Sequence, residues 1–341
     1  MVAGEVVRRA VEECKSVQAS MATEEASLGT GISEAKGAAS VKADETPVTA
    51  LDFGLQGYVS ERLKEAFPGD SFMGEESLPE DLPDWQVKDA EEIAKRCLGR
   101  SFEFGEAVDR GVTPPTKDSR VWILDPIDGT KGLITGQQYV VGLCLVDSKG
   151  LPLVAAMGNP LGAPSDVMLA VKGRGIRYYT KDEDLKDLSL PETWQARSFD
   201  YSKLAKSVQG SWGELGSVGQ KPGIDFPPYL LSRPMDQGSP LPFGPMAPPS
   251  EVCCGALVKY WAVATGAVAG FIQYQSQLKS WDHAPGILCV QEAAGTATDA
   301  KSQPILFDDR VVNVDTAVVC CAPNIDQRAK QLFMDAVNTT P

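Results

Sequence analysis

The chain has 341 residues, of which 43% are hydrophobic and 23% are charged, which is the composition of an ordinary globular protein. Its formal net charge of −14 argues against a nucleic acid polymer or an anionic membrane as a partner, because both bind basic surfaces. A small anionic ligand is compatible with this charge, provided that bound cations reverse its sign locally.

The N-terminal part of the chain predicts two amphipathic helices. Apolar residues recur every three or four positions over residues 5–21 and 49–67, which is the period of a helix with one buried face. Thr49 stands at the start of the second segment and is placed to cap that helix, and the segment PGD closes it. Residues 78–118 are polar and charged, which predicts a mixture of helix and loop.

The middle of the chain predicts β-structure. The run RVWILD predicts a strand that ends in a turn containing glycine. Alternating apolar residues on both sides of DSKG predict a hairpin, and MLAVKGRGIRYY predicts a second hairpin that turns at Gly173–Gly175. The stretch from Pro222 to Pro249 is rich in proline and has no periodicity, so we expect an insertion loop there.

Beyond this loop the sequence predicts further helices and one more strand. Residues 252–272 form the longest apolar window, but Lys259 lies near its middle and alanine and glycine dominate it, which favours a buried helix over a membrane span. The run TAVVCCAP predicts a strand, and a closing helix follows from about Asn324. Together the elements predict an α/β (α+β) fold with alternating layers of helix and sheet and a subdomain boundary near residue 160.

The eight cysteines and the N-terminus bear on the compartment. Several cysteines lie in apolar runs, as free buried cysteines do, and neither adjacent pair, Cys253–Cys254 or Cys320–Cys321, resembles the disulfide framework of a secreted protein. The opening segment MVAGEVVRRAVEECK is charged and amphipathic, unlike a secretory signal. We therefore expect a reduced, soluble, cytoplasmic protein, with an organelle such as a plastid or mitochondrion left open.

Acidic residues stand at the edges of four predicted elements, as Asp44, Glu75–Glu76, Asp125 with Asp128, and Asp282. Taken singly, each has a structural explanation: Asp44 as the start of a turn, Glu75 as a solvated surface charge and Asp282 as a helix cap. The segment DPIDGT carries more information, because two carboxylates at the end of a strand suit a hard cation such as Mg²⁺. The amides of Gly129 and Thr130 are placed to bind an anion there, although a purely structural turn is the alternative.

The motifs GEES, WILDPIDGT and WDHAPG, in this order and at these separations, resemble those of the magnesium-dependent, lithium-sensitive phosphatases. This superfamily includes inositol monophosphatase, fructose-1,6-bisphosphatase and the 3′(2′),5′-bisphosphate nucleotidases, and the resemblance covers nearly the whole chain. It implies a layered α-β-α-β-α sandwich, with an N-terminal α+β subdomain over residues 1–160 that carries most metal ligands. Residues 161–341 would form a C-terminal α/β subdomain with the proline-rich insertion near 219–250.

Three segments resemble the bisphosphate nucleotidase branch in particular, namely KADETPVTALD, DPIDGTKG and GQQYVVGLCLV. Lys259-Tyr260, at the start of the apolar helix, also matches that branch. The resemblance implies a Mg²⁺-dependent phosphatase that hydrolyses the 3′-phosphate of adenosine 3′,5′-bisphosphate (PAP) to give AMP, with the sulfated precursor (PAPS) as a further substrate. The partner would be this small phosphorylated molecule, and the protein would be a monomer or a small homo-oligomer.

Carried over position by position, the resemblance implies a role for each matching residue. Two to three Mg²⁺ ions would be held by the Ile127 carbonyl and by four carboxylates, those of Glu75, Asp125, Asp128 and Asp282. Asp44 and Thr130 would orient and deprotonate the attacking water. The amides of Gly129 and Thr130 would hold the phosphate, and Lys259 and Asp282 would contact the substrate. Bound metal ions lower the pKa of water, so a chain with a single histidine needs no histidine base.

Departures from the branch lie on the side that recognises the substrate. Ala256 stands where the branch has serine, Gln273 where it has arginine, and Trp212 where it has histidine. An arginine binds a phosphate through two hydrogen bonds, so its loss keeps an inositol or other sugar-phosphate phosphatase open as the alternative. Lys279 and Arg233 are the candidates to replace it. A catalytically silent nucleotide sensor is disfavoured, because the metal carboxylates and the threonine of DPIDGT are all present.

Overall fold

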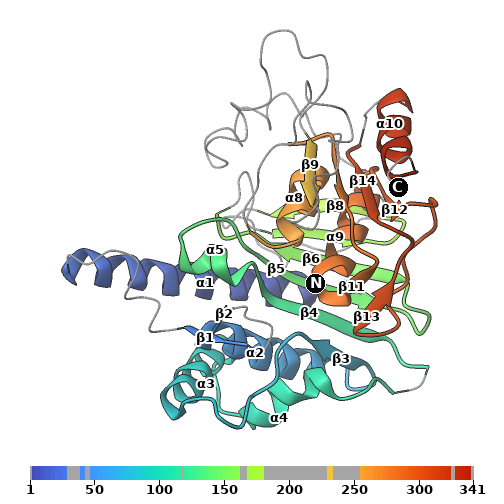
Figure 1. The fold of residues 1–341 in the computed structure, drawn as a ribbon. Helices are drawn as coiled ribbons and strands as arrows, with labels where there is room; N and C mark the ends of the chain where they lie inside the picture. Colours follow the sequence, from blue (N-terminus) through green and yellow to red (C-terminus); the bar gives the residue numbers. More distant parts are fainter. Residues whose placement is uncertain are drawn as a thin grey trace.

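Two helices from the N-terminal part of the chain cover one face of the larger sheet (Figure 1). The structure is a computed structural model that describes residues 2–28, 39–42, 47–116, 118–161, 167–179, 229–232, 254–323 and 327–338. Helix α1 spans Val2–Leu28 and α2 spans Ala50–Ala66. As predicted, Thr49 caps α2: its hydroxyl oxygen accepts a hydrogen bond from the N–H of Leu51 at 3.2 Å. Asp52 completes the capping box by accepting the Thr49 N–H at 2.8 Å.

Six strands form the larger sheet in the order β3-β4-β5-β6-β7-β8. Their bounds are Ser71–Gly74, Val121–Asp128, Val140–Val146, Pro152–Gly158, Val167–Val171 and Gly175–Tyr179. Strands β3 and β4 are parallel, and the other neighbours are antiparallel, which confirms both predicted hairpins, β5–β6 and β7–β8. The sheet continues beyond residue 160 with β7 and β8, and the division into two subdomains at that residue stays a prediction.

Helices fill most of the segment between β3 and β4, where a mixture of helix and loop was expected. They are α3 (Asp84–Leu98), α4 (Phe104–Asp109) and a 3₁₀ helix (Arg110–Val112). Both α3 and α4 pack against α2. A short antiparallel ladder of β1 (Ala39–Val41) and β2 (Pro47–Thr49) leads the chain into α2.

The apolar segment 252–272 is not a single helix, contrary to the prediction. Helix α8 covers only Leu257–Ala264, and Gly270–Gln273 form strand β10. Gly266 ends the helix in the left-handed region, with a φ of 72°, and the next N–H returns to a carbonyl of the last helical turn. Among the helices of the described residues, none combines the length and the apolar character that a membrane span requires.

Strand β10 belongs to a second sheet with the order β12-β14-β10-β9. The other strands are β12 (Thr296–Asp299), β14 (Val318–Cys321) and β9 (Tyr229–Ser232). Strand β14 confirms the strand predicted at TAVVCCAP, and the closing helix α10 (Gln327–Asn338) follows it. Apart from β9, the proline-rich stretch lies outside the described residues, as do Trp212 and Arg233.

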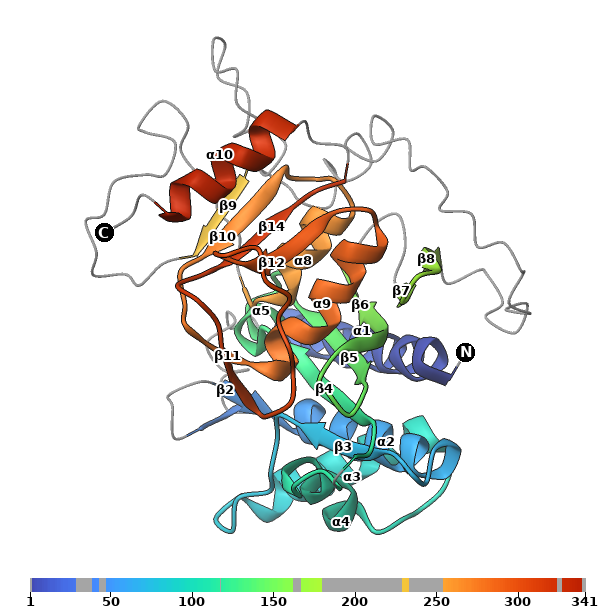
Figure 2. The same ribbon diagram turned by 90° about the vertical axis from the view of Figure 1, so that its right-hand side faces the viewer.

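The elements alternate in layers, as Figures 1 and 2 show. From one side to the other these are α10, the four-stranded sheet, α8 with α9 (Ser280–Glu292), the six-stranded sheet, and α1 with α2. Separate hydrophobic cores lie on the two faces of the six-stranded sheet, and a third lies between the four-stranded sheet and α10. This arrangement confirms the layered α-β-α-β-α sandwich. Beside α9, β11 (Gln277–Lys279) pairs with β13 (Val311–Asn313).

The cysteines agree with the expectation of free thiols only in part. The free cysteines among the described residues are Cys14, Cys97, Cys144, Cys289, Cys320 and Cys321. Cys254, however, is disulfide-bonded. The expectation of a reduced protein with free thiols therefore does not hold at Cys254.

Candidate metal centre

An irregularity at the end of β4 brings two aspartates together. Strand β4 is buried along its whole length and pairs regularly with β5 as far as Asp125, but the register shifts between Asp125 and Asp128. In a regular strand, residues three apart point to opposite faces of the sheet, so the shift lets both carboxylates turn to one side. The N–H of Ile127 donates to Asp125 Oδ1 at 3.0 Å and holds the chain in this turn.

Asp282 reaches the same place from α9. The helix begins after Lys279, which makes no side-chain capping bond, and Asp282 lies inside the first turn. Its role is therefore not that of a helix cap. One carboxylate oxygen from each of Asp125, Asp128 and Asp282 can be chosen so that all three atoms lie within 4.8 Å of one another.

Burial and the proximity of these carboxylates to one another raise their pKa values. For Asp125 the main cause is burial, and the charges of Glu75, Asp128 and Asp282 raise its pKa further. Burial and the charges of Asp128 and Glu75 raise the pKa of Asp282 to about 8. Carboxylates held this close out of water are stabilised by a cation between them, and an all-oxygen donor set suits a hard divalent ion. The residues therefore fit a metal such as Mg²⁺.

The start of α8 holds the carboxylate of Asp128. The N–H of Ala256 donates to Asp128 Oδ1 at 2.9 Å, and the N–H of Leu257 donates to Oδ2 at 2.5 Å. These contacts oppose the effect of burial, which raises the pKa of Asp128 to about 6. Because Ala256 donates through its backbone N–H, this contact does not depend on the side chain at this position.

Glu75 and Glu76 follow β3 and face Lys42. The Lys42 Nζ lies 2.7 Å from a carboxylate oxygen of each glutamate. Burial raises the pKa of Glu76 to about 8, with a further contribution from Glu75 that Lys42 opposes. The charge of Glu75 also raises the pKa values of Asp125 and Asp282, as expected for a carboxylate at the edge of the aspartate cluster. The side chain of Glu75 is only 17% exposed, so it is not a solvated surface charge.

A buried glutamine on α2 fixes the backbone of Glu76. Gln56 Oε1 accepts the Glu76 N–H at 2.9 Å, and Gln56 Nε2 donates to the Glu76 carbonyl at 2.6 Å. The same Nε2 donates to the Val108 carbonyl at 2.8 Å, so both amide protons and the amide oxygen are used. Gly74 makes room for this contact, because a Cβ at that position would overlap the Gln56 amide. Gln56 was not predicted from the sequence, in which the glycine before Glu75 is the one local sign of this contact.

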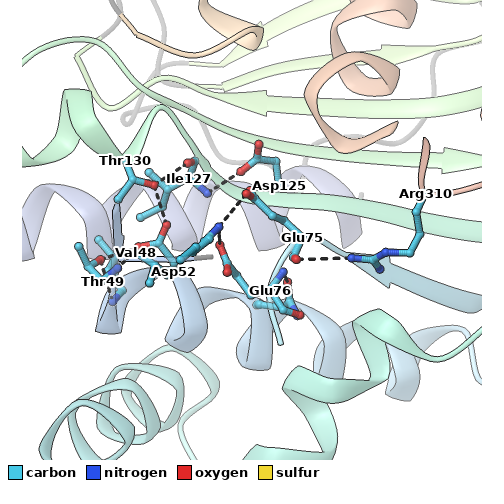
Figure 3. A network of polar contacts seen from close by, with 12 residues as sticks. Val48, Thr49, Asp52, Glu75, Glu76, Asp125, Ile127, Thr130 and Arg310 are labelled. Carbon is cyan, nitrogen blue, oxygen red and sulfur yellow. Dashed lines mark hydrogen bonds and ion pairs between the residues drawn. The ribbon is translucent and has the colours of Figure 1, made fainter. Parts of the chain in front are cut away.

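The hydroxyl of Thr130 is paired with a second residue that sequence analysis left without a role, Asp52 (Figure 3). Thr130 begins α5 (Thr130–Ile134), directly after β4. Its Oγ1 donates to Asp52 Oδ1 at 2.9 Å and lies 3.2 Å from the Ile127 carbonyl. Burial raises the pKa of Asp52 to about 6, against its hydrogen bonds with Thr49 and Thr130 and the charge of Lys42. Asp44, the predicted partner of Thr130, lies outside the described residues.

Both the sequence and the fold match known proteins. The family described as "Inositol monophosphatase family" matches residues 2–339. The chain belongs to this family. A 3′(2′),5′-bisphosphate nucleotidase of Emericella nidulans is 30% identical over 322 residues, which cover 80% of this chain and 83% of the relative. Another, of Schizosaccharomyces pombe, is 29% identical over 296 residues, which cover 78% of this chain and 77% of the relative. The structure of inositol monophosphatase from Anabaena (Nostoc) sp. PCC 7120 covers 100% of this chain and 95% of its own, with a TM-score of 0.54 at 14% identity.

Membership in the inositol monophosphatase family makes the chain a metal-dependent phosphatase of phosphate monoesters. The carboxylates of Asp125, Asp128 and Asp282 are its candidate metal ligands. In this family fold the centre lies where the end of β4, the loop after β3 and the starts of α8 and α9 meet.

Lys259 and Gln273, two further residues for which the sequence suggested a role in substrate binding, are buried in the structure. Burial lowers the pKa of Lys259, and the charges of Asp128 and Asp282 oppose this effect, so the ammonium group faces the aspartates. Gln273 ends β10, and its Nε2 donates to Gln275 Oε1 at 2.7 Å. The Gln273 Oε1 is buried and has no partner among the described residues.

We expect Gly74→Ala to lower the melting temperature and to reduce activity. The added methyl group would overlap the Gln56 amide and would displace either the amide or the backbone of Glu75 and Glu76. Overpacking of this kind costs about 1–3 kcal/mol. Thermal unfolding would measure the loss, with Gly69→Ala as the control, because a Cβ at Gly69 meets nothing within 4 Å. Equal melting temperatures for the two variants would contradict the proposed close contact.

Proposed function

We propose that the protein is a magnesium-dependent phosphatase that removes the 3′-phosphate of PAP to give AMP and that also accepts PAPS. The observation that carries the proposal is the cluster of Asp125, Asp128 and Asp282. The hydroxyl of Thr130 follows two residues after Asp128 in the chain, at the start of α5. The name of the relatives that match most of the chain supports the choice of substrate.

The metal ligands in this proposal are Glu75, Asp125, Asp128, Asp282 and the carbonyl of Ile127, which would hold two to three ions. When bound, Mg²⁺ offsets the charge of the phosphate and lowers the pKa of a coordinated water. Carboxylates whose pKa values are raised by one another gain the most from such a charge, because the cation removes their mutual repulsion. Lys42 would keep Glu76 neutralised while Glu75 serves the metal.

Thr130 and Asp52 would orient the attacking water. Because Thr130 donates its hydroxyl proton to Asp52, the lone pairs of its oxygen can accept a hydrogen bond from that water. Asp52, with a pKa raised to about 6, is the base that would receive the proton through the hydroxyl. Asp44 stays the prediction made from the sequence for this role, and Asp52 is the residue that we propose.

The phosphate would bind to the amides of Gly129 and Thr130 at the turn after β4. Lys259 and Asp282 would contact the remainder of the substrate. The buried ammonium of Lys259 balances the charges of Asp128 and Asp282, and a phosphate or hydroxyl group of the substrate would be a further partner for it.

An inositol or other sugar-phosphate phosphatase is the second candidate, and Gln273 favours it. This side chain is neutral where the nucleotidase branch has arginine, so it offers no bidentate contact to a 5′-phosphate. Its buried Oε1, which has no partner in the part of the chain that the structure describes, is instead an acceptor that suits a hydroxyl group.

Phosphate release from a panel of substrates tests the two candidates. The panel would contain PAP, PAPS, inositol 1-phosphate, inositol 1,4-bisphosphate and fructose 1,6-bisphosphate with Mg²⁺, and Asp125→Asn would serve as the blank. We expect the highest kcat/KM for PAP, whereas a preference for an inositol phosphate would establish the second candidate. Gln273→Arg sharpens the test, because it should improve kcat/KM for PAP about tenfold or more through a restored bidentate contact and leave inositol 1-phosphate unchanged.

A further inference from the structure

Arg310 is joined to the start of α9 through its backbone. It precedes β13, whose first residue, Val311, pairs with Lys279 at the end of β11. The carbonyl of Arg310 accepts the N–H of Ser280, the first residue of α9, at 2.9 Å. The hydroxyl of Ser280 also donates to the carbonyl of Asp309. The helix that carries Asp282 therefore begins directly on this segment.

The side chain of Arg310 points from the segment before β13 towards the loop after β3 (Figure 3). Its guanidinium carbon lies 4.6 Å from the centroid of the Trp281 ring, which is a cation–π contact with the residue next to Asp282. Nη1 donates to the Gly111 carbonyl at 2.7 Å, and Nη2 donates to the Glu75 carbonyl at 3.5 Å. One side chain thus touches the neighbour of Asp282 and the backbone of Glu75, which is 235 residues away in the chain.

Two of the three partners of Arg310, Trp281 and Glu75, belong to parts of the centre whose separation depends on tertiary contacts. Asp125 and Asp128 lie on one strand, so the backbone of β4 fixes the distance between them. Glu75 and Asp282 come from a loop and a helix that are far apart in sequence. The planar guanidinium of Arg310 stacks on Trp281 of the helix and donates to the Glu75 carbonyl of the loop, and so it holds the helix and the loop at a fixed distance.

We propose that Arg310 is a positioning residue that sets the distance between Glu75 and Asp282 and thereby the affinity of the centre for metal. The inference rests on the proposed function, since it requires that these carboxylates bind Mg²⁺. Residues that orient metal ligands without touching the metal change metal affinity by about 10–100-fold when they are replaced. A purely structural arginine would change the stability of the fold and leave the metal affinity as it is.

The test compares Arg310→Met and Arg310→Lys with the same changes at Arg120. Arg120, just before β4, makes two bonds to Asp70, just before β3, at 2.9 and 3.0 Å. It therefore joins the starts of these two parallel strands, at the end of each strand that lies away from the centre. Metal binding would be followed without substrate, from the rise in melting temperature with Mg²⁺ concentration. Phosphate release at each Mg²⁺ concentration would provide the second measurement.

For Arg310→Met, we expect the Mg²⁺ concentration at half-maximal stabilisation and at half-maximal activity to rise about tenfold or more. Activity should largely return at saturating Mg²⁺, and Arg310→Lys should lie between this variant and the wild type, because lysine keeps the charge but not the planar fork. The variants at Arg120 should lower the melting temperature with unchanged Mg²⁺ dependence. The same pattern for Arg310→Met would overturn the inference, and a wild type that Mg²⁺ does not stabilise would instead refute the proposed function.

Discussion

Asp125→Asn should abolish phosphate release and, in the absence of metal, raise the melting temperature of the protein. The loss of activity follows from the loss of a metal ligand, which removes several kcal/mol of charge stabilisation, or about 10³-fold in rate. The gain in stability has the same origin: Asp125 is buried among Glu75, Asp128 and Asp282, and each of them raises its pKa. An amide of the same shape keeps the bond from the Ile127 N–H and removes one charge from the cluster.

The measurements are thermal unfolding in EDTA and in Mg²⁺, together with phosphate release. We expect the variant to be more stable than the wild type in EDTA, by about 2–4 °C for each kcal/mol recovered, and to lose the stabilisation by Mg²⁺. Asp147→Asn is the matched control, because Asp147 accepts two N–H groups in the turn between β5 and β6, far from the carboxylate cluster. A variant that is active, or that is less stable than the wild type in EDTA, would contradict the proposed centre.

The pH dependence of the metal-free protein provides an independent check on the same cluster. The folded-state pKa values of Asp128 and Asp282 are raised to about 6 and about 8, above their values in the unfolded chain. The folded state therefore binds more protons, and its stability is greatest below about pH 4 for these groups and falls as the pH rises through 6 to 8. In EDTA the wild type should thus unfold at a lower temperature at pH 8 than at pH 6, and Mg²⁺ should remove most of this difference.

The elements that depend on local sequence agree with the predictions. The cap at Thr49 and the hairpin around DSKG are set by residues that are neighbours in the chain. The segment 252–272 differs, because β10 forms through pairing with β9 and β14, which are distant in sequence. Its apolar composition suits a buried strand as well as a buried helix, and the left-handed Gly266 is the local sign of the change.

The site shows the same division between local and distant signals. The aspartates of DPIDGT can be predicted as site residues from the sequence, since two carboxylates at the end of a strand have few purely structural uses. The motif that contains Asp52 also contains the capping box, and that local role conceals its bond to Thr130, 78 residues away. Gln56 and Arg310 bind backbone groups of Glu76 and Glu75 across 20 and 235 residues, and no periodicity or motif in the sequence reports such contacts.

Thr130→Val and Asp52→Asn should each lower kcat by about 10²–10⁴-fold, the range expected when a group that orients or accepts the proton of water is lost. Valine replaces the hydroxyl by a methyl group of similar size. Asparagine cannot accept at both oxygens, so it loses either the bond from Thr130 to Oδ1 or the bonds from Thr49 to Oδ2. Single-turnover phosphate release at saturating Mg²⁺ would measure the effect on the chemical step.

The double variant decides whether the two residues act as one unit. If Asp52 works only through the Thr130 hydroxyl, combining the changes should cost no more than the larger single effect, whereas independent roles would multiply. Thr49→Ala separates catalysis from capping, because it removes a hydroxyl from Asp52 and the cap of α2, at about 1 kcal/mol, but leaves the bond to Thr130. This control should lower the melting temperature and retain kcat. Multiplicative losses in the double variant would instead mean that Asp52 serves the fold and that another base, with Asp44 as the first candidate, accepts the proton.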